Sequence, residues 1–145
     1  MAAKEMIATL GLARHPEGGW YRETWRAAGE DARAGGTAIL FLLEAGQRSH
    51  WHRVDAAELW LWHAGDPLVV LVAQENGAVR EFPLGGDVAA GYQPQCLVPA
   101  SRWQSTEALA TEARAGWALV SCVVVPGFEF AGFELAPPGW HPGQE

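Results

Sequence analysis

Residues 49–65 read SHWHRVDAAELWLWHAG, and this stretch decides the fold. Side chains alternate between the two faces of a strand, so His50 and His52 are expected to point the same way. A short turn at 55–57 separates this strand from a second one that begins with Glu58. The stretch therefore predicts a hairpin that brings two imidazoles and a carboxylate together on one face.

The rest of the chain continues the pattern of short apolar or alternating segments. Asn76-Gly77 is the strongest two-residue hairpin signal in the sequence. Residues 27–36 are rich in alanine and glycine and are expected to form a loop. Strands are expected at 20–25, 37–43, 49–54, 58–62, 68–74, 79–84, 95–98, 117–125 and 128–135. About nine short strands separated by turns predict an all-β sandwich or barrel.

Helix is expected only at the start of the chain. Met6, Ile7 and Leu10 have helical spacing within residues 3–12, and Gly11 is a plausible stop signal. A length of 145 residues is that of one domain, so residues 1–145 are expected to form a single unit. Its core is expected at roughly 8–137, with a loose C-terminal tail at 138–145.

Composition excludes several classes of partner. The net charge is −7, from 10 basic and 17 acidic residues, which argues against nucleic acid and against a membrane surface. The two cysteines, Cys96 and Cys122, are too few for a disulfide framework and are expected to be buried thiols. The N-terminus lacks the pattern of a signal peptide, and no apolar run is long enough to span a bilayer. A cytoplasmic location is expected.

The spacing Gly46-x3-His50-x-His52-x5-Glu58-x6-Gly65 resembles the first motif of the cupin superfamily. Within it, the chain is similar to a group of small bacterial and fungal proteins, the cupin-5 type. The resemblance also rests on HPEGGWYRET (15–24), VPASRWQS (98–105) and PGFEFAGFELA (126–136). It implies a double-stranded β-helix, or jelly-roll barrel, with a short N-terminal helix, and a homodimer. In the second motif, the usual histidine falls at Gln104.

The first functional hypothesis is a metal-dependent enzyme acting on a small molecule. Two imidazoles and a carboxylate are suitable ligands for a divalent ion and leave positions open for water or substrate. His50, His52 and Glu58 would bind iron, manganese, nickel or zinc, with Gln104 near the fourth position. The metal would act as a Lewis acid.

Two alternatives remain open. One is a metal-free epimerase or isomerase, in which His52 is the base and Tyr21 the best candidate for the partner acid. The other is a non-catalytic module that holds a small ligand among Trp60, Trp62 and Gln104. In either case Arg22 is a candidate for contacting an anionic group, although an exposed salt bridge is the simpler interpretation.

The chain contains 8 tryptophans, which suggests a thick aromatic core, an aromatic pocket or a dimer interface. The apolar run at 37–43 is expected to be a strand that is either buried on both faces or placed at a subunit interface. Together these features predict a homodimer.

Overall fold

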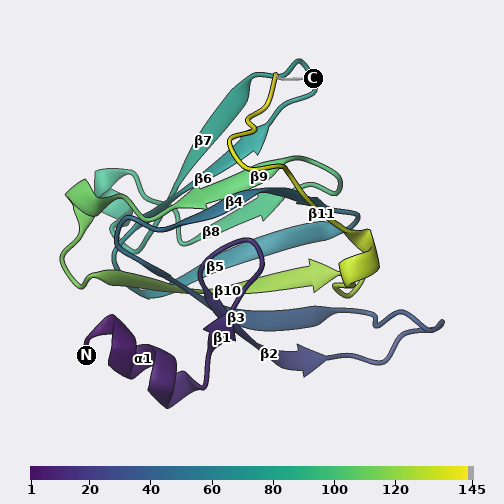
Figure 1. Ribbon diagram of the computed structural model, residues 1–145, viewed down its shortest axis with the longest axis horizontal. Coiled ribbons are helices and arrows are strands. Elements are labelled where there is room, and N and C mark those ends of the chain that lie inside the picture. Colours follow the sequence, from purple (N-terminus) through teal and green to yellow (C-terminus); the bar gives the residue numbers. More distant parts are fainter. Residues whose placement is uncertain (144–145) are drawn as a thin grey trace.

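A computed structural model describes residues 1–143 of the chain. Two antiparallel β-sheets face each other and enclose the core, and one short helix lies outside them (Figure 1). This is the predicted all-β jelly-roll barrel with an N-terminal helix, and the prediction is confirmed.

The first sheet has six strands in the order β1-β2-β3-β10-β5-β8. Their bounds are β1 Ala13–Arg14, β2 Trp20–Arg26, β3 Thr37–Glu44, β5 Ala57–Gly65, β8 Gln95–Val98 and β10 Trp117–Val125. The long strands β3, β10 and β5 form its centre, and each of their pairings is antiparallel. Most of these strands lie where the alternation of the sequence predicts them.

The second sheet has five strands in the order β11-β4-β9-β6-β7. Their bounds are β4 Arg48–Val54, β6 Leu68–Ala73, β7 Val79–Leu84, β9 Gln104–Glu107 and β11 Phe133–Leu135. β6 and β7 form the hairpin expected from Asn76-Gly77, and they pair from Leu68 with Leu84 to Ala73 with Val79.

Helix α1, Ala3–Leu10, packs against the outer face of the first sheet. It ends at Gly11, whose φ of +65° is the left-handed conformation that glycine adopts readily. Its apolar side chains contact Leu42 of β3, whereas Phe41 and Leu43 of the same strand point into the barrel. β3 is therefore buried on both faces within one chain, and the homodimer stays a prediction.

The main core lies between the sheets, around Trp60 and Phe41, both fully buried with their rings perpendicular at 5.8 Å. Three short 3₁₀ turns connect the strands: η1 Val88–Ala90, η2 Ala110–Glu112 and η3 Phe130–Gly132. The wide loop at 27–36 carries no strand or helix, as expected.

The structure differs from the expected elements in several places, among them the short strand β1, which the sequence did not predict. Residues 104–107 form a strand that the sequence did not predict, because QSTE lacks an apolar alternation. Conversely, only 133–135 of the expected strand at 128–135 is a strand, since η3 interrupts the segment. The C-terminal tail is not loose at Trp140, whose ring packs 4.6 Å from that of Trp103. Residues 144–145 of the tail lie outside the described residues.

Along residues 1–143, α1 is the one α-helix, and no helix is long and apolar enough to cross a membrane.

Candidate functional site

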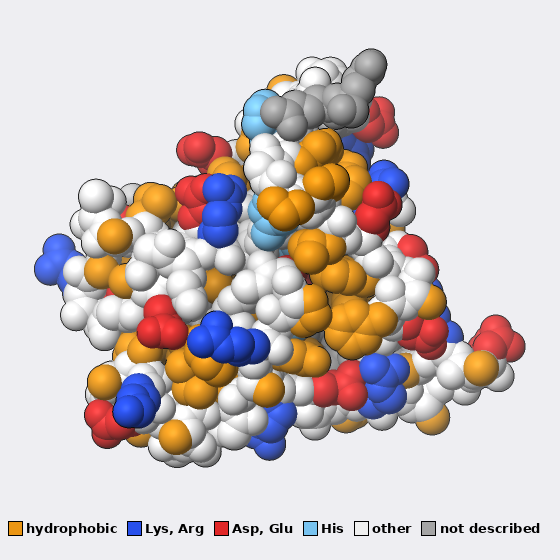
Figure 2. Space-filling model, viewed as in Figure 1, with side chains coloured by type: hydrophobic (Ala, Val, Ile, Leu, Met, Phe, Trp, Pro, Cys, Tyr) orange, Lys and Arg blue, Asp and Glu red, His pale blue; other side chains and the backbone are white. Residues whose placement is uncertain are grey.

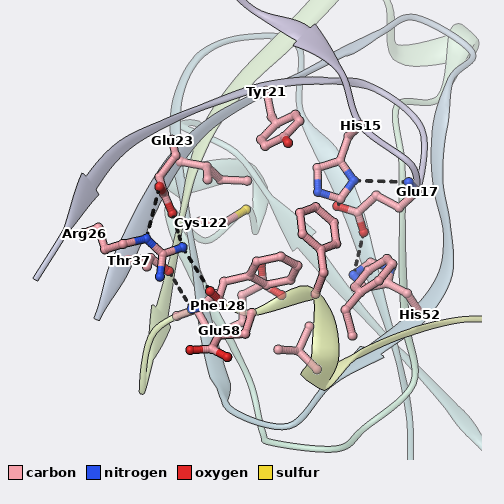
Figure 3. Close-up of a pocket in the computed structure, with 16 residues that line it drawn as sticks. His15, Glu17, Tyr21, Glu23, Arg26, Thr37, His52, Glu58, Cys122 and Phe128 are labelled. Carbon is pink, nitrogen blue, oxygen red and sulfur yellow. Dashed lines mark hydrogen bonds and ion pairs between the residues drawn. The ribbon is translucent and has the colours of Figure 1, made fainter. Parts of the chain in front are cut away.

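A cavity of about 260 Å³ lies at one end of the barrel, between the ends of the central strands and the segment 128–133 (Figure 3). Strands β2, β3, β4, β5 and β10 and the loop before β2 contribute its walls. Its polar lining side chains are His15, Glu17, Tyr21, Glu23, Arg26, Thr37, His52, Glu58, Cys122 and Glu129. Its apolar lining side chains are Ile39, Val54, Val124, Phe128, Phe130 and Phe133.

The centre of the polar group is an ion pair between His52 and Glu17. His52 Nε2 lies 2.7 Å from Glu17 Oε2, and the two side chains are only 2% and 7% exposed. The other ring nitrogen, Nδ1, lies 2.7 Å from the carbonyl oxygen of His50. Because a carbonyl oxygen and a carboxylate both accept hydrogen bonds, both nitrogens of His52 carry protons. The ring is therefore an imidazolium.

Opposing effects set the pKa of His52. Burial lowers it, but the negative charge of Glu17 and the hydrogen bond to that carboxylate raise it, to about 9. Burial raises the pKa of Glu17, but the charge of His52, the hydrogen bonds from His52 and Ser49 and the charge of His15 together outweigh this effect, so that the pKa of Glu17 lies below its ordinary value. The pair thus stays charged at neutral pH.

Two adjacent glycines bring Glu17 to this position. Gly18 and Gly19 have φ values of +103° and +79°, which L side chains rarely adopt. A Cβ on Gly19 would lie 2.8 Å from side-chain atoms of Phe41 and Leu43, so only glycine lets the loop approach the sheet this closely. The backbone N–H of His50 also donates to the carbonyl oxygen of Glu17, which ties the loop to β4.

Glu58 is the second buried carboxyl group at the cavity, and it is 7% exposed. Gln104 Nε2 donates to Glu58 Oε1 at 2.8 Å. Burial raises the pKa of Glu58, and the negative charge of Glu17 raises it further, to about 7. Burial also raises the pKa of the Cys122 thiol, which is hydrogen-bonded to Glu58. Glu58 is therefore a group that can gain or lose a proton near neutral pH.

The expectation that His50 and His52 share a face is contradicted by the structure. Ser49 pairs with Thr106 and His52 with Gln104. Between these pairs, two residues of β4 therefore lie opposite one residue of β9. This bulge breaks the alternation of the strand and turns His50 away from the cavity. His50 Nε2 lies 3.0 Å from the carbonyl oxygen of Pro137 instead.

The other predicted site residues fall into two groups. Tyr21 lines the cavity with His52 and Glu58. Gln104 is buried behind it, where it links Glu58 to Trp60 by accepting from Trp60 Nε1 at 3.1 Å.

The side chains that were expected to bind a ligand do not line this cavity. Trp60 and Trp62 do share a face with Glu58, but they continue into the core, and Trp62 reaches Gly86 at the opposite end of the barrel. Arg22 follows Tyr21 in β2 and is exposed on the outer face of the sheet. The two tryptophans do not reach the cavity because they are part of the apolar core that fills the barrel beyond Glu58.

As arranged, these side chains do not fit a divalent ion. Both nitrogens of His52 are occupied, His50 points away, and the carbonyl oxygen of Gln104 accepts from an indole N–H. Over residues 1–143, no group of three or more histidine, cysteine, aspartate or glutamate side chains is placed to hold a metal ion. The predicted ligand set of His50, His52 and Glu58 is therefore not assembled.

The sequence analysis did not identify Glu17 or His15 as residues of the site, although both line the cavity. Both lie in the stretch HPEGGWYRET (15–24), which contributed to the family resemblance but not to the predicted site. The signal that could have found them is the pair of consecutive glycines after two ionisable side chains spaced two apart. Such glycines permit a close approach of the backbone, which brings neighbouring side chains into the interior.

The rim of the cavity combines charged and aromatic side chains. Arg26 forms an ion pair with Glu23 at 2.7 Å and donates to the carbonyl oxygen of Phe128 at 3.1 Å. Phe128, Phe130 and Phe133 pack edge to face with ring centroids 5.0–6.0 Å apart. Figure 2 shows hydrophobic side chains gathered on the right-hand side of the view, where the segment 128–135 lies.

Comparisons with known proteins agree with this architecture. The sequence profile described as "Cupin superfamily (DUF985)" matches residues 4–136. A hypothetical protein from Leishmania major is 34% identical, with a TM-score of 0.85, and the match covers 94% of this chain and 88% of that one. A protein from Shewanella oneidensis is 38% identical, with a TM-score of 0.86 and coverage of 94% and 85%.

More distant structures share the fold alone. Oxalate decarboxylase from Bacillus subtilis is 20% identical over 84% of this chain and 29% of that one, with a TM-score of 0.64. A further structure of the same enzyme, which concerns its Mn(II) centres, is 19% identical with a TM-score of 0.62. None of the curated proteins matches the chain.

Proposed function

This chain belongs to the cupin superfamily, and from that premise we propose that it is a small-molecule enzyme whose acid–base groups are its own side chains rather than a bound metal. The observation that carries the proposal is the engagement of both ring nitrogens of His52 by Glu17 and by the carbonyl oxygen of His50. His52 Nε2, the nitrogen that would bind a metal ion, is already paired with the carboxylate of Glu17.

Glu58 is the residue that would transfer the proton. It lines the cavity, and its pKa of about 7 gives comparable amounts of acid and base at neutral pH. The ion pair of Glu17 and His52 would hold the electrostatic field around it constant, because both members stay charged. This differs from the metal-free alternative considered for the sequence, in which His52 was the base.

The metal-dependent hypothesis requires a rearrangement. Glu17 would have to leave His52, and His50 would have to turn inward against the bulge of β4. The Mn(II) centres of oxalate decarboxylase belong to a protein only 19% identical to this one, so they add little weight. We therefore place the metal-free function first.

Elemental analysis of untagged protein, before and after incubation with iron, manganese, nickel and zinc, tests this proposal. We expect metal well below one ion per chain in the wild type and no difference in the His52→Ala variant. A near-stoichiometric ion that disappears in His52→Ala would contradict the proposal. Unfolding in urea, with and without a chelator, provides an independent measurement, because a structural or catalytic ion raises the stability of the folded state.

A further inference from the structure

His15 presents a hydrogen-bond donor to the cavity. The ring is 8% exposed, and its Nδ1 accepts from the backbone N–H of Glu17 at 3.1 Å. Nδ1 therefore carries no proton in this arrangement, and Nε2 carries one. Burial keeps the pKa of His15 below its ordinary value, which favours this neutral form.

The Nε2–H group of His15 has no acceptor within the described part of the chain. The ring lies against the cavity, beside Tyr21, with the two rings edge to face at 4.5 Å (Figure 3). The Tyr21 hydroxyl likewise has no hydrogen-bond partner among residues 1–143. One wall of the cavity thus offers two donors to an oxygen atom of a ligand.

The charges around the cavity disfavour an anionic ligand. The lining contains four carboxyl groups against two cationic side chains. Both cations are already used, since His52 pairs with Glu17 and Arg26 pairs with Glu23. A carboxylate or phosphate would therefore meet negative charge without a free cation to balance it.

The remaining surface selects an apolar body. Phe128, Phe130 and Phe133 form one side of the cavity, with Ile39, Val54 and Val124 completing the apolar lining. The volume of about 260 Å³ is slightly below the roughly 300–1,000 Å³ of pockets for drug-sized ligands, so the ligand is small.

We infer that the cavity takes a small neutral carbonyl compound with a flat or branched apolar body. Its carbonyl oxygen would accept hydrogen bonds from His15 Nε2–H and the Tyr21 hydroxyl, and its apolar body would lie against Phe128, Phe130 and Phe133. Glu58 would remove a proton from the carbon next to the carbonyl. This inference rests on the proposed function, and it adds the class of substrate and the role of His15.

The step balances without a further reactant. The C–H bond breaks and its electron pair forms the C=C bond of an enolate, while the C=O π pair moves to the oxygen. The negative charge on that oxygen is held by the two donors of His15 and Tyr21, in the manner of an oxyanion hole. The proton goes to the carboxylate of Glu58, which returns it or exchanges it with solvent first.

Matched ketone and carboxylate probes test the substrate class. Phenylacetone and 4-methylpentan-2-one are neutral carbonyl compounds with an aromatic and a branched body, and phenylacetate and 4-methylpentanoate are the anions of corresponding shape. We expect at least one ketone to bind about tenfold or more tightly than its anion by calorimetry. Tyr21→Phe should weaken that binding about tenfold, as expected for loss of one hydrogen bond. Tighter binding of the anions, or binding of neither ketone, overturns the inference.

Exchange in D₂O tests the chemical step separately. The exchange rate is measured from the disappearance of the α-proton NMR signal of the ketone. This rate should fall about 100-fold or more in Glu58→Gln, whereas the affinity for the ketone should change less than about threefold. His15→Phe keeps a ring in place without the N–H group and should also reduce the exchange rate. Glu81→Gln, an exposed change on β7, is the control. Binding of ketones with exchange that does not depend on Glu58 would contradict the proposed function and leave the ligand class intact.

Discussion

Replacing Glu17 by glutamine removes one negative charge from the cavity and keeps its shape. The pKa of His52 is about 9 in the folded protein, against an ordinary value of 6.5. Because folding raises this pKa, the charged ring stabilises the fold fully below pH 6.5, and this contribution is lost as the pH rises through 9. The difference between the two pKa values corresponds to about 3 kcal/mol. A similar loss is expected when one partner of a buried ion pair is removed.

The hydrogen bonds of His52 can survive in Glu17→Gln. Nδ1 can still donate to the carbonyl oxygen of His50, and a neutral Nε2 can accept from the new amide. The variant therefore isolates the charge. We expect the free energy of unfolding to fall by about 3 kcal/mol near pH 6. The difference should shrink at about pH 10, where the wild-type imidazolium has lost its proton.

Urea unfolding followed by tryptophan fluorescence across this pH range measures the difference directly, with Glu81→Gln as the control for a surface carboxylate. NMR titration of the His52 ring provides a second measurement. The pKa of His52 should fall from about 9 in the wild type to below 6.5 in the variant. A loss of stability that is equal at both ends of the pH range would refute the reasoning. So would a wild-type His52 that titrates at an ordinary value.

Three further changes probe the scaffold, each measured by urea unfolding. Trp60→Phe should lower stability by about 3 kcal/mol, because it removes a fully buried indole and leaves the Gln104 carbonyl oxygen without its donor; a loss below about 1 kcal/mol would contradict this. Asp66→Asn should lower stability by about 2 kcal/mol, since the carboxylate accepts from the backbone N–H groups of 114–116; an unchanged midpoint would show that an amide serves equally well. Gly65→Ala should lower stability by about 3 kcal/mol, because φ is +85° and a Cβ would collide with β10; wild-type stability would mean that the turn can relax.

Much of the fold was predictable because its elements are encoded locally. The strands at 79–84, 95–98 and 117–125 have the expected bounds. Each combines β-branched or apolar residues with turn signals at its ends. The strand at 104–107 was not predictable in this way, since its residues are polar and are held in the barrel by pairing with β4 and β6.

The candidate site was only partly predictable. His52, Glu58 and Tyr21 do line one cavity, because each is placed by the register of its own strand. Glu17 depends instead on a loop that folds back over the sheet, and nothing near it in the sequence identifies its partner. Contacts between residues so far apart in sequence follow from tertiary packing, which local periodicity does not encode.

The bulge in β4 also limits what a sequence motif can mean. A motif such as H-x-H places both histidines on one face only if the strand alternates regularly between them. The extra residue of the bulge shifts this alternation, so that Ser49 and His52 face the barrel interior while His50 faces outward. The same motif is therefore compatible with two different arrangements of side chains inside the barrel. In this barrel the partner of His52 is the carboxylate of Glu17 rather than a second histidine.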